Sequence, residues 1–132
     1  MRVLLAHDGS AGAAEATALT AAIPWPSDSA LRVVNVIEPI LSSMSGPWDR
    51  GSVPSPELDA TITASAEEML REVIESLEAS GRSIDATVLR GRPASAIIDE
   101  AREFRADLVI VGSRGHGAIA SLLLGSPEFQ RR

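Results

Sequence analysis

The sequence predicts an α/β fold, a three-layer sandwich in which helices cover both faces of a parallel β-sheet. Three short apolar runs, residues 3–6, 31–37 and 108–111, are nearly continuous, which is typical of strands buried on both faces. Stretches with the spacing of amphipathic helices separate these runs, so strands and helices alternate along the chain. The length of 132 residues suits one domain, and an apolar content of 45% suffices for one core.

Two stretches depart from this regular alternation. Residues 84–89 form a fourth expected strand, but Asp85 and Thr87 alternate with its apolar residues and make one face wetter. This pattern favours a position at the edge of the sheet. Residues 38–56 are rich in Pro and Gly, and they predict a long loop between the second strand and the second helix.

Helices are expected in the gaps between the strands. Ser10 is a suitable N-cap for the first helix, which Pro24 ends. The second helix covers residues 57–80 with its apolar residues on one stripe, and Gly81 stands at its C-cap position. Pro93 opens the third helix. The order is therefore β-α-β-loop-α-β-α-β, which favours a parallel sheet with right-handed crossovers.

The composition excludes several kinds of chemistry. All twelve basic residues are Arg, which excludes a Schiff-base lysine and the phosphate-binding lysines of P-loop proteins and kinases. The chain holds no Cys, so disulfides and thiolate catalysis are excluded. The net charge of −6 disfavours a nucleic-acid surface, and no apolar stretch approaches the roughly 20 residues that cross a membrane. We expect a cytoplasmic protein with no nucleic-acid or membrane partner.

The candidate binding motif follows the last predicted strand. Ligands of open parallel sheets bind beyond the carboxyl ends of the strands. At that place the pattern Gly-x2-Gly-x9-Gly-Ser is formed by Gly112, Gly115, Gly125 and Ser126. Glycines there allow backbone N–H groups to turn toward an anion, and Arg114 can pair with phosphate oxygens. The alternative is an ordinary Gly-rich surface turn.

In two regions the chain resembles the universal stress protein family. Residues 3–10 look like the first strand of the family with the Asp-Gly-Ser that follows it. Residues 109–117, together with Gly125 and Ser126, match its ATP-binding pattern, Gly-x2-Gly-x9-Gly-Ser/Thr. The likeness spans most of residues 1–126, which we interpret as one universal stress protein-like nucleotide-binding domain.

The resemblance implies an adenine-nucleotide α-hydrolase-like sheet of five parallel strands in the order 3-2-1-4-5. It also implies that ATP lies across the ends of strands one and four, often with Mg²⁺ or Mn²⁺. Asp8 would lie near the base and the ribose, and Val36 would contact the adenine through its backbone. The ribose and phosphates would be held by Gly112, Arg114, Gly115, Gly125 and Ser126, and Ala6 and Val111 complete the expected binding set. Without the resemblance, Asp8 is equally well interpreted as part of the cap of the first helix.

The chain departs from the family after Ser126. Such domains continue into a helix and a fifth strand, commonly the edge through which they form homodimers, but only six residues follow Ser126 here. We therefore expect a sheet of order 3-2-1-4 that lacks the fifth, dimerising strand, with residues 127–132 as a short disordered tail. Residues 108–111 would then form an unprotected apolar edge.

The resemblance implies an ATP-binding universal stress protein that acts as a nucleotide-dependent regulator of the stress response. A slow ATPase is a second hypothesis, but the chain lacks Lys and Asp8 is its only evident general base, so we assign no catalytic residue. No metal-ligating residue is assigned either. A nucleotide-free interaction module is a third hypothesis, and a protein that binds cyclic AMP instead of ATP is a fourth.

Overall fold

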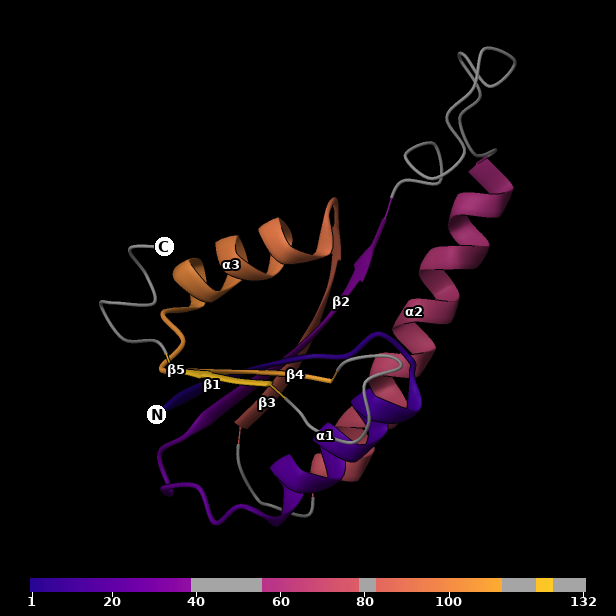
Figure 1. Cartoon of the computed structure of the whole chain (residues 1–132). Coiled ribbons are helices and arrows are strands. Elements are labelled where there is room, and N and C mark those ends of the chain that lie inside the picture. Colours follow the sequence, from indigo (N-terminus) through magenta and orange to yellow (C-terminus); the bar gives the residue numbers. More distant parts are fainter. Residues whose placement is uncertain (39–55, 79–82, 113–120, 125–132) are drawn as a thin grey trace.

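The computed structural model describes residues 1–38, 56–78 and 83–112, and the backbone of residues 121–124. Strands and helices alternate along most of the chain (Figure 1). In order, the elements are β1 (Arg2–Ala6), α1 (Ala11–Ala22), β2 (Ala30–Ile37), α2 (Pro56–Leu77), β3 (Ser83–Arg90), α3 (Pro93–Phe104), β4 (Leu108–Val111) and β5 (Ser121–Leu124).

The described strands form one sheet in the order β3-β2-β1-β4-β5. The pairs β1–β2, β1–β4 and β2–β3 are parallel. This confirms the predicted parallel sheet with the order 3-2-1-4, and it confirms that the strand with alternating polar residues lies at an edge. The strand order reverses between β1 and β4, which is where open α/β sheets bind their ligands.

The outer side of β4 carries a strand that the sequence did not predict. β5 pairs with β4 in the antiparallel direction, with Leu108 opposite Leu124 and Val111 opposite Ser121. The expectation that β4 is an unprotected edge is therefore wrong. An antiparallel neighbour needs only a short connection, whereas a parallel one needs a crossover of a dozen or more residues. The short apolar run of β5 lies inside the glycine motif, where no strand was predicted.

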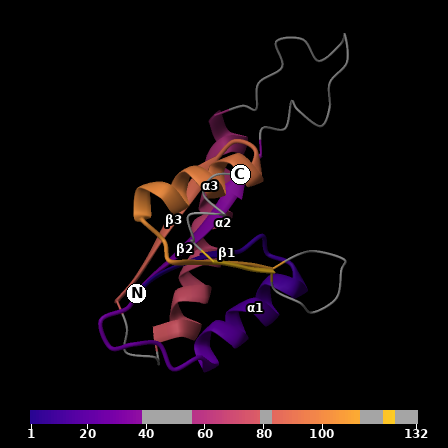
Figure 2. The same cartoon turned by 60° about the vertical axis from the view of Figure 1, so that its left-hand side comes forward.

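Two apolar layers lie on opposite faces of the sheet, as the three-layer prediction requires. On one face, Leu70, Val73 and Leu77 of α2 and Ala16 of α1 pack against inward side chains of β1, β2 and β4. On the other face, Phe104 packs with the alternate side chains of the same strands. Figures 1 and 2 show α3 and α1 on opposite sides of the strands from two directions.

The helix ends follow the predicted signals. Ser10 caps α1, because its Oγ accepts a hydrogen bond of 3.2 Å from the N–H of Ala13. The helix ends at Ala22, before Pro24, and α3 begins at Pro93 as predicted. The second helix begins one residue earlier than expected, at Pro56. Most of the predicted loop (39–55), the expected C-cap Gly81 and the expected tail (127–132) lie outside the described residues.

An ion-pair network ties α3 to the sheet. Arg32 of β2 contacts Asp85 of β3 through its Nε at 2.9 Å and Glu100 of α3 through its Nη1 at 2.8 Å. The guanidinium also lies 4.4 Å from the centre of the Phe104 ring. The hydrogen bond to Asp85, helped by Glu100, raises the pKa of Arg32 further above its ordinary value despite some burial. The network therefore fixes α3 over β2 and β3. None of the helices described is long and apolar enough to span a lipid bilayer.

Candidate functional site

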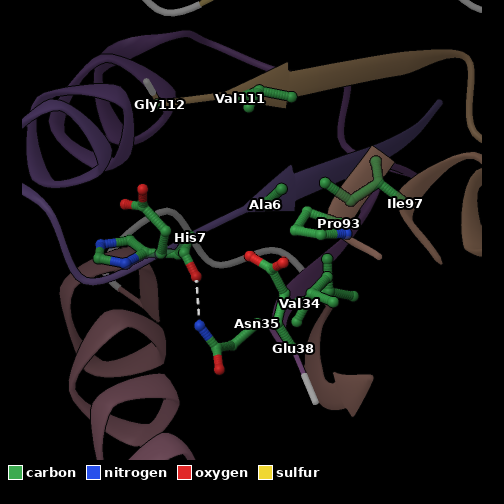
Figure 3. A pocket seen from close by; sticks show the side chains of 11 residues that line it. Ala6, His7, Val34, Asn35, Glu38, Pro93, Ile97, Val111 and Gly112 are labelled. Carbon is green, nitrogen blue, oxygen red and sulfur yellow. Dashed lines mark hydrogen bonds between the residues drawn. The ribbon is translucent and has the colours of Figure 1, made fainter. Parts of the chain in front are cut away.

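A cavity of about 440 Å³ lies at the carboxyl ends of β1, β2 and β4. This volume falls within the range of about 300–1,000 Å³ that is usual for small-molecule sites. The beginning of α3 closes one side of the cavity through Pro93 and Ile97 (Figure 3). Among the described residues, the cavity is lined by Ala6, His7, Asp8, Val34, Asn35, Val36, Glu38, Pro93, Ile97, Val111 and Gly112.

The structure brings together the predicted site residues that it describes. Ala6, Asp8, Val36, Val111 and Gly112 all line the cavity, although they come from three different strand ends. Parallel strands point their carboxyl ends to one edge of the sheet, which is why residues far apart in the sequence meet here. The remaining predicted residues, Arg114, Gly115, Gly125 and Ser126, lie outside the described residues.

His7 has a structural role that the sequence did not reveal in detail. Its side chain is buried, and its Nδ1 accepts a hydrogen bond of 3.0 Å from the N–H of Gly9. An imidazole nitrogen that accepts from a backbone N–H carries no proton, so the ring is neutral with its proton on Nε2. Burial lowers the pKa of His7, and the charge of Asp8 opposes this effect in part. The ring therefore supports the turn between β1 and α1 in its neutral form.

The turn after β1 fixes the position of Asp8. Gly9 adopts a φ of 84°, in the left-handed region where a side chain is unfavourable. The Oδ1 of Asp8 accepts a hydrogen bond of 2.9 Å from the N–H of Ser10, the residue that caps α1. Asp8 therefore stabilises the turn, which is the structural role that the sequence left open, and it is exposed and lines the cavity.

The hydrogen-bond ladder between β1 and β2 ends at the cavity. The N–H of His7 donates to the carbonyl of Val34 over 2.8 Å, so the backbone of Val34 faces β1. The carbonyl of Ile37 accepts from the N–H of Gly91 over 3.1 Å, on the β3 side. Backbone groups of successive strand residues point to opposite sides, so the N–H and C=O of Val36 face the β1 side. Because β1 has already ended there, Val36 presents both groups to the cavity that it lines.

Asn35 supplies the bond that ends this ladder. Its Nδ2 donates to the carbonyl of His7 over 2.8 Å (Figure 3). In a continued parallel ladder, the N–H of Val36 would use this carbonyl. The side chain of Asn35 takes that place, and it holds the ends of β1 and β2 together without a further backbone rung. The sequence signal for this role was the polar Asn35 near the end of the largely apolar run 31–37.

Gly112 is required by packing, whatever binds nearby. A Cβ atom at this position would lie 2.3 Å from the Cα of Ala13 and 2.7 Å from the carbonyl oxygen of Gly12. Both are backbone atoms at the start of α1, and they cannot move without moving the helix. The first glycine of the motif is therefore explained by the contact between β4 and α1, a reason that sequence reasoning missed.

The charges of the cavity are unevenly distributed. Within the described part of the lining, Asp8 and Glu38 are carboxylates, and no Arg is present. Glu38 points its carboxylate toward the middle of the cavity, near Pro93 (Figure 3). This part of the cavity therefore suits the hydrogen-bond donors of a ligand rather than its anionic groups. In the described portion of the chain, no group of three or more His, Cys, Asp or Glu residues is placed to hold a metal ion.

A mainly parallel sheet covered by helices on both faces, with a cavity at its strand reversal, defines an α/β domain with a candidate ligand site. The chain belongs to the universal stress protein family, because the model of that family matches residues 1–127. A universal stress protein of Thermus aquaticus is 36% identical over 124 residues, which cover 94% of this chain and 85% of the relative. One of Mycobacterium tuberculosis is 33% identical over 132 residues. The chain spans only 41% of that relative's length.

Solved structures of the same family share the fold. A universal stress protein family protein of Arabidopsis thaliana with AMP bound gives a TM-score of 0.63 at 21% identity, covering 90% of this chain and 80% of that one. A universal stress protein in complex with cAMP gives a TM-score of 0.58 at 22% identity, covering 90% of this chain and 77% of that one. At this level of identity the likeness concerns the fold alone.

Proposed function

We propose that this chain binds an adenine nucleotide, ATP in the first place, in the cavity at the ends of β1, β2 and β4. The observation that carries the proposal is the backbone of Val36, which offers one N–H and one C=O to a cavity of suitable size. Membership of the universal stress protein family supports it. So do the relatives of this fold that hold AMP and cAMP.

The backbone of Val36 matches the Watson–Crick edge of adenine. Its N–H would donate to N1 of the base, and its C=O would accept from the 6-amino group. Ala6, Val34 and Ile97 offer apolar surface for the flat faces of the base. A donor and an acceptor at fixed positions favour adenine over a base with the opposite pattern, because mismatched groups would lose their hydrogen bonds on burial.

The sugar and phosphates would extend from the base toward Asp8 and Gly112. The Asp8 carboxylate is a hydrogen-bond acceptor and lines the cavity, so it suits ribose hydroxyl groups, which are donors. The phosphates would pass toward Arg114, Gly115, Gly125 and Ser126, which form the nucleotide-binding pattern of the sequence. Binding in the micromolar range needs about 8 kcal/mol, more than one helix end or one ion pair supplies, so base burial and several amide contacts must combine. Mg²⁺ or Mn²⁺ would enter with the triphosphate.

We assign the chain a regulatory role rather than efficient catalysis. Phosphoryl transfer requires a positioned water and neutralisation of the developing charge. The described part of the cavity presents carboxylates, and the chain contains no Lys. In this proposal the protein is a nucleotide-dependent regulator in the cytoplasm, which works through a conformational or partner change. The proposal also includes assembly as a homodimer.

Isothermal titration of the purified chain with ATP and Mg²⁺, with AMP and cyclic AMP as competitors, tests the proposal. Mass spectrometry of nucleotide retained through purification identifies the natural ligand. We expect the Gly115→Val variant to keep its melting temperature and to bind ATP at least about tenfold more weakly, because a side chain blocks the approach of backbone amides to phosphate. Folded chain that binds no adenine nucleotide at millimolar concentration would refute the proposal.

A further inference from the structure

The carboxylate of Glu38 is a feature of the cavity that the resemblance to the family did not assign. Glu38 follows directly after the last residue of β2. Side chains alternate along a strand, so Glu38 continues the row of Val34 and Val36 on the face that α3 covers. Figure 3 shows its carboxylate pointing into the pocket, toward Pro93. No hydrogen bond or ion pair joins this carboxylate to another described residue.

We propose that Glu38 makes the cavity select 6-amino purines over 6-oxo purines. This inference rests on the proposed binding of a nucleotide at the same site. The 6-amino group of adenine carries two hydrogens, and the carbonyl of Val36 can accept only one of them. The side chain of Glu38, two residues further along, continues the row of the Val36 side chain and lines the same cavity, so its carboxylate would accept the second one. An ionised carboxylate has only acceptors, so it complements an amino group and no other group at that position.

A 6-oxo purine presents the opposite pattern to the same residues. Its O6 is an acceptor, and it would face both the carbonyl of Val36 and the carboxylate of Glu38. Two acceptors in contact repel each other, and the carbonyl of Val36 would lose its partner when the base covers it, which is the situation in which proteins discriminate most strongly. Glu38 therefore adds to the selectivity that the backbone of Val36 provides. The hydrogen bond to the carboxylate is the stronger of the two, because a hydrogen bond to a charged acceptor is stronger than one to a neutral acceptor.

The test compares ATP with inosine triphosphate, which carries O6 in place of the 6-amino group and a hydrogen on N1; the Glu38 variants therefore separate the effect of the carboxylate from that of the Val36 backbone. Dissociation constants of both nucleotides are measured for the wild type and for the Glu38→Ala and Glu38→Gln variants. Asp99→Asn serves as a matched control, because Asp99 is an exposed acid on α3 that does not line the cavity. Melting curves verify that each variant folds.

We expect the wild type to prefer ATP, and we expect Glu38→Ala to reduce this preference about tenfold, mainly by weakening ATP binding. Glu38→Gln should reduce the preference as strongly but retain more affinity for ATP. Its amide can rotate to accept from the amino group or to donate to O6. Asp99→Asn should leave the ratio of the two dissociation constants unchanged.

Three results would overturn the inference. Equal changes for both nucleotides in Glu38→Ala would show that Glu38 acts without reading the base. A loss that is seen with ATP but vanishes with 2′-deoxy-ATP would assign Glu38 to a ribose hydroxyl. Equal affinity of the wild type for ATP and inosine triphosphate would reject the selectivity while leaving nucleotide binding intact. Absence of binding of either nucleotide to the wild type would instead reject the proposed function, and the inference with it.

Discussion

The Gly112→Ala substitution tests the packing at the centre of the site. The added Cβ would lie 2.3 Å from the Cα of Ala13 and 2.6 Å from its backbone nitrogen. A normal carbon contact is about 3.5–4.0 Å, so β4 and α1 must separate by more than 1 Å or so to accept the methyl group. Overpacking of this kind costs about 1–3 kcal/mol. For a domain of this size, the melting temperature should fall by about 4–12 °C.

Urea unfolding and thermal melting of the wild type and the variant measure this cost. Gly91 provides the control, because no atom lies within 4 Å of a Cβ built there, although its φ of 130° makes any side chain strained. We expect the Ala and Leu variants of Gly91 to agree within about 0.5 kcal/mol. At Gly112, Leu should cost about 1–3 kcal/mol more than Ala, because each added atom enters occupied space.

A Gly112→Ala variant as stable as the wild type would refute the steric argument. Agreement between Ala and Leu at this position would refute it as well, since the cost would then come from the backbone alone. Weaker nucleotide binding by Gly112→Ala would not by itself identify a phosphate contact, because α1 begins with the turn that holds Asp8 and Ser10.

Two further predictions concern the hydrogen bonds around His7. Replacing Asn35 by Leu removes the donor to the His7 carbonyl, and we expect the free energy of unfolding in urea to fall by about 1–3 kcal/mol. The second concerns pH: the pKa of His7 is lowered from its ordinary 6.5, so the unfolded chain takes up a proton first as the pH falls. The stability from neutral His7 is therefore complete above that value and is lost as the pH falls through 6.5 toward the folded-state pKa. A His7→Asn variant should show a smaller loss of stability between about pH 7 and pH 5.

Each of these two predictions has its own control. Asn35→Ser shortens the side chain without making it apolar, so a water molecule can restore part of the lost bond and the cost should be smaller than for Leu. Equal stability of Asn35→Leu and the wild type would show that the bond to His7 contributes nothing. For His7, the quantity of interest is the difference between the two pH profiles, because carboxylates titrate in both proteins. Parallel profiles would contradict a proton-linked role of His7.

The parallel part of the fold could be predicted because it depends on local patterns. Continuous apolar runs identified the buried strands, and the alternation around Asp85 identified β3 as an edge. Ser10 and Pro93 marked helix starts through capping chemistry, which acts within one turn. β5 was missed because four residues carry too little pattern to predict a strand. Its formation also depends on pairing with the open outer edge of β4, which does not adjoin it in the sequence.

The site could be predicted only as far as strand ends define it. Asp8 and Val36 were recognisable because each follows or ends a buried strand. Pro93 and Ile97 reach the cavity through the placement of α3, which depends on the contacts of Arg32 across three elements. Such long-range contacts leave no periodic trace in the sequence. The direction of the Glu38 side chain likewise follows from the extension of β2 beyond the end of β1.

The short antiparallel strand beside β4 affects how the protein behaves at high concentration. An edge strand with unpaired N–H and C=O groups and bulky aliphatic side chains can pair with strands of other chains, which begins aggregation. β5, Ser121–Leu124, covers the outer edge of β4 with residues of the same molecule. The opposite rim is β3, where Asp85 and Arg90 place charges that oppose stacking of further strands. Extension of the sheet by further chains is therefore disfavoured at β3, and at β4 it is prevented by β5.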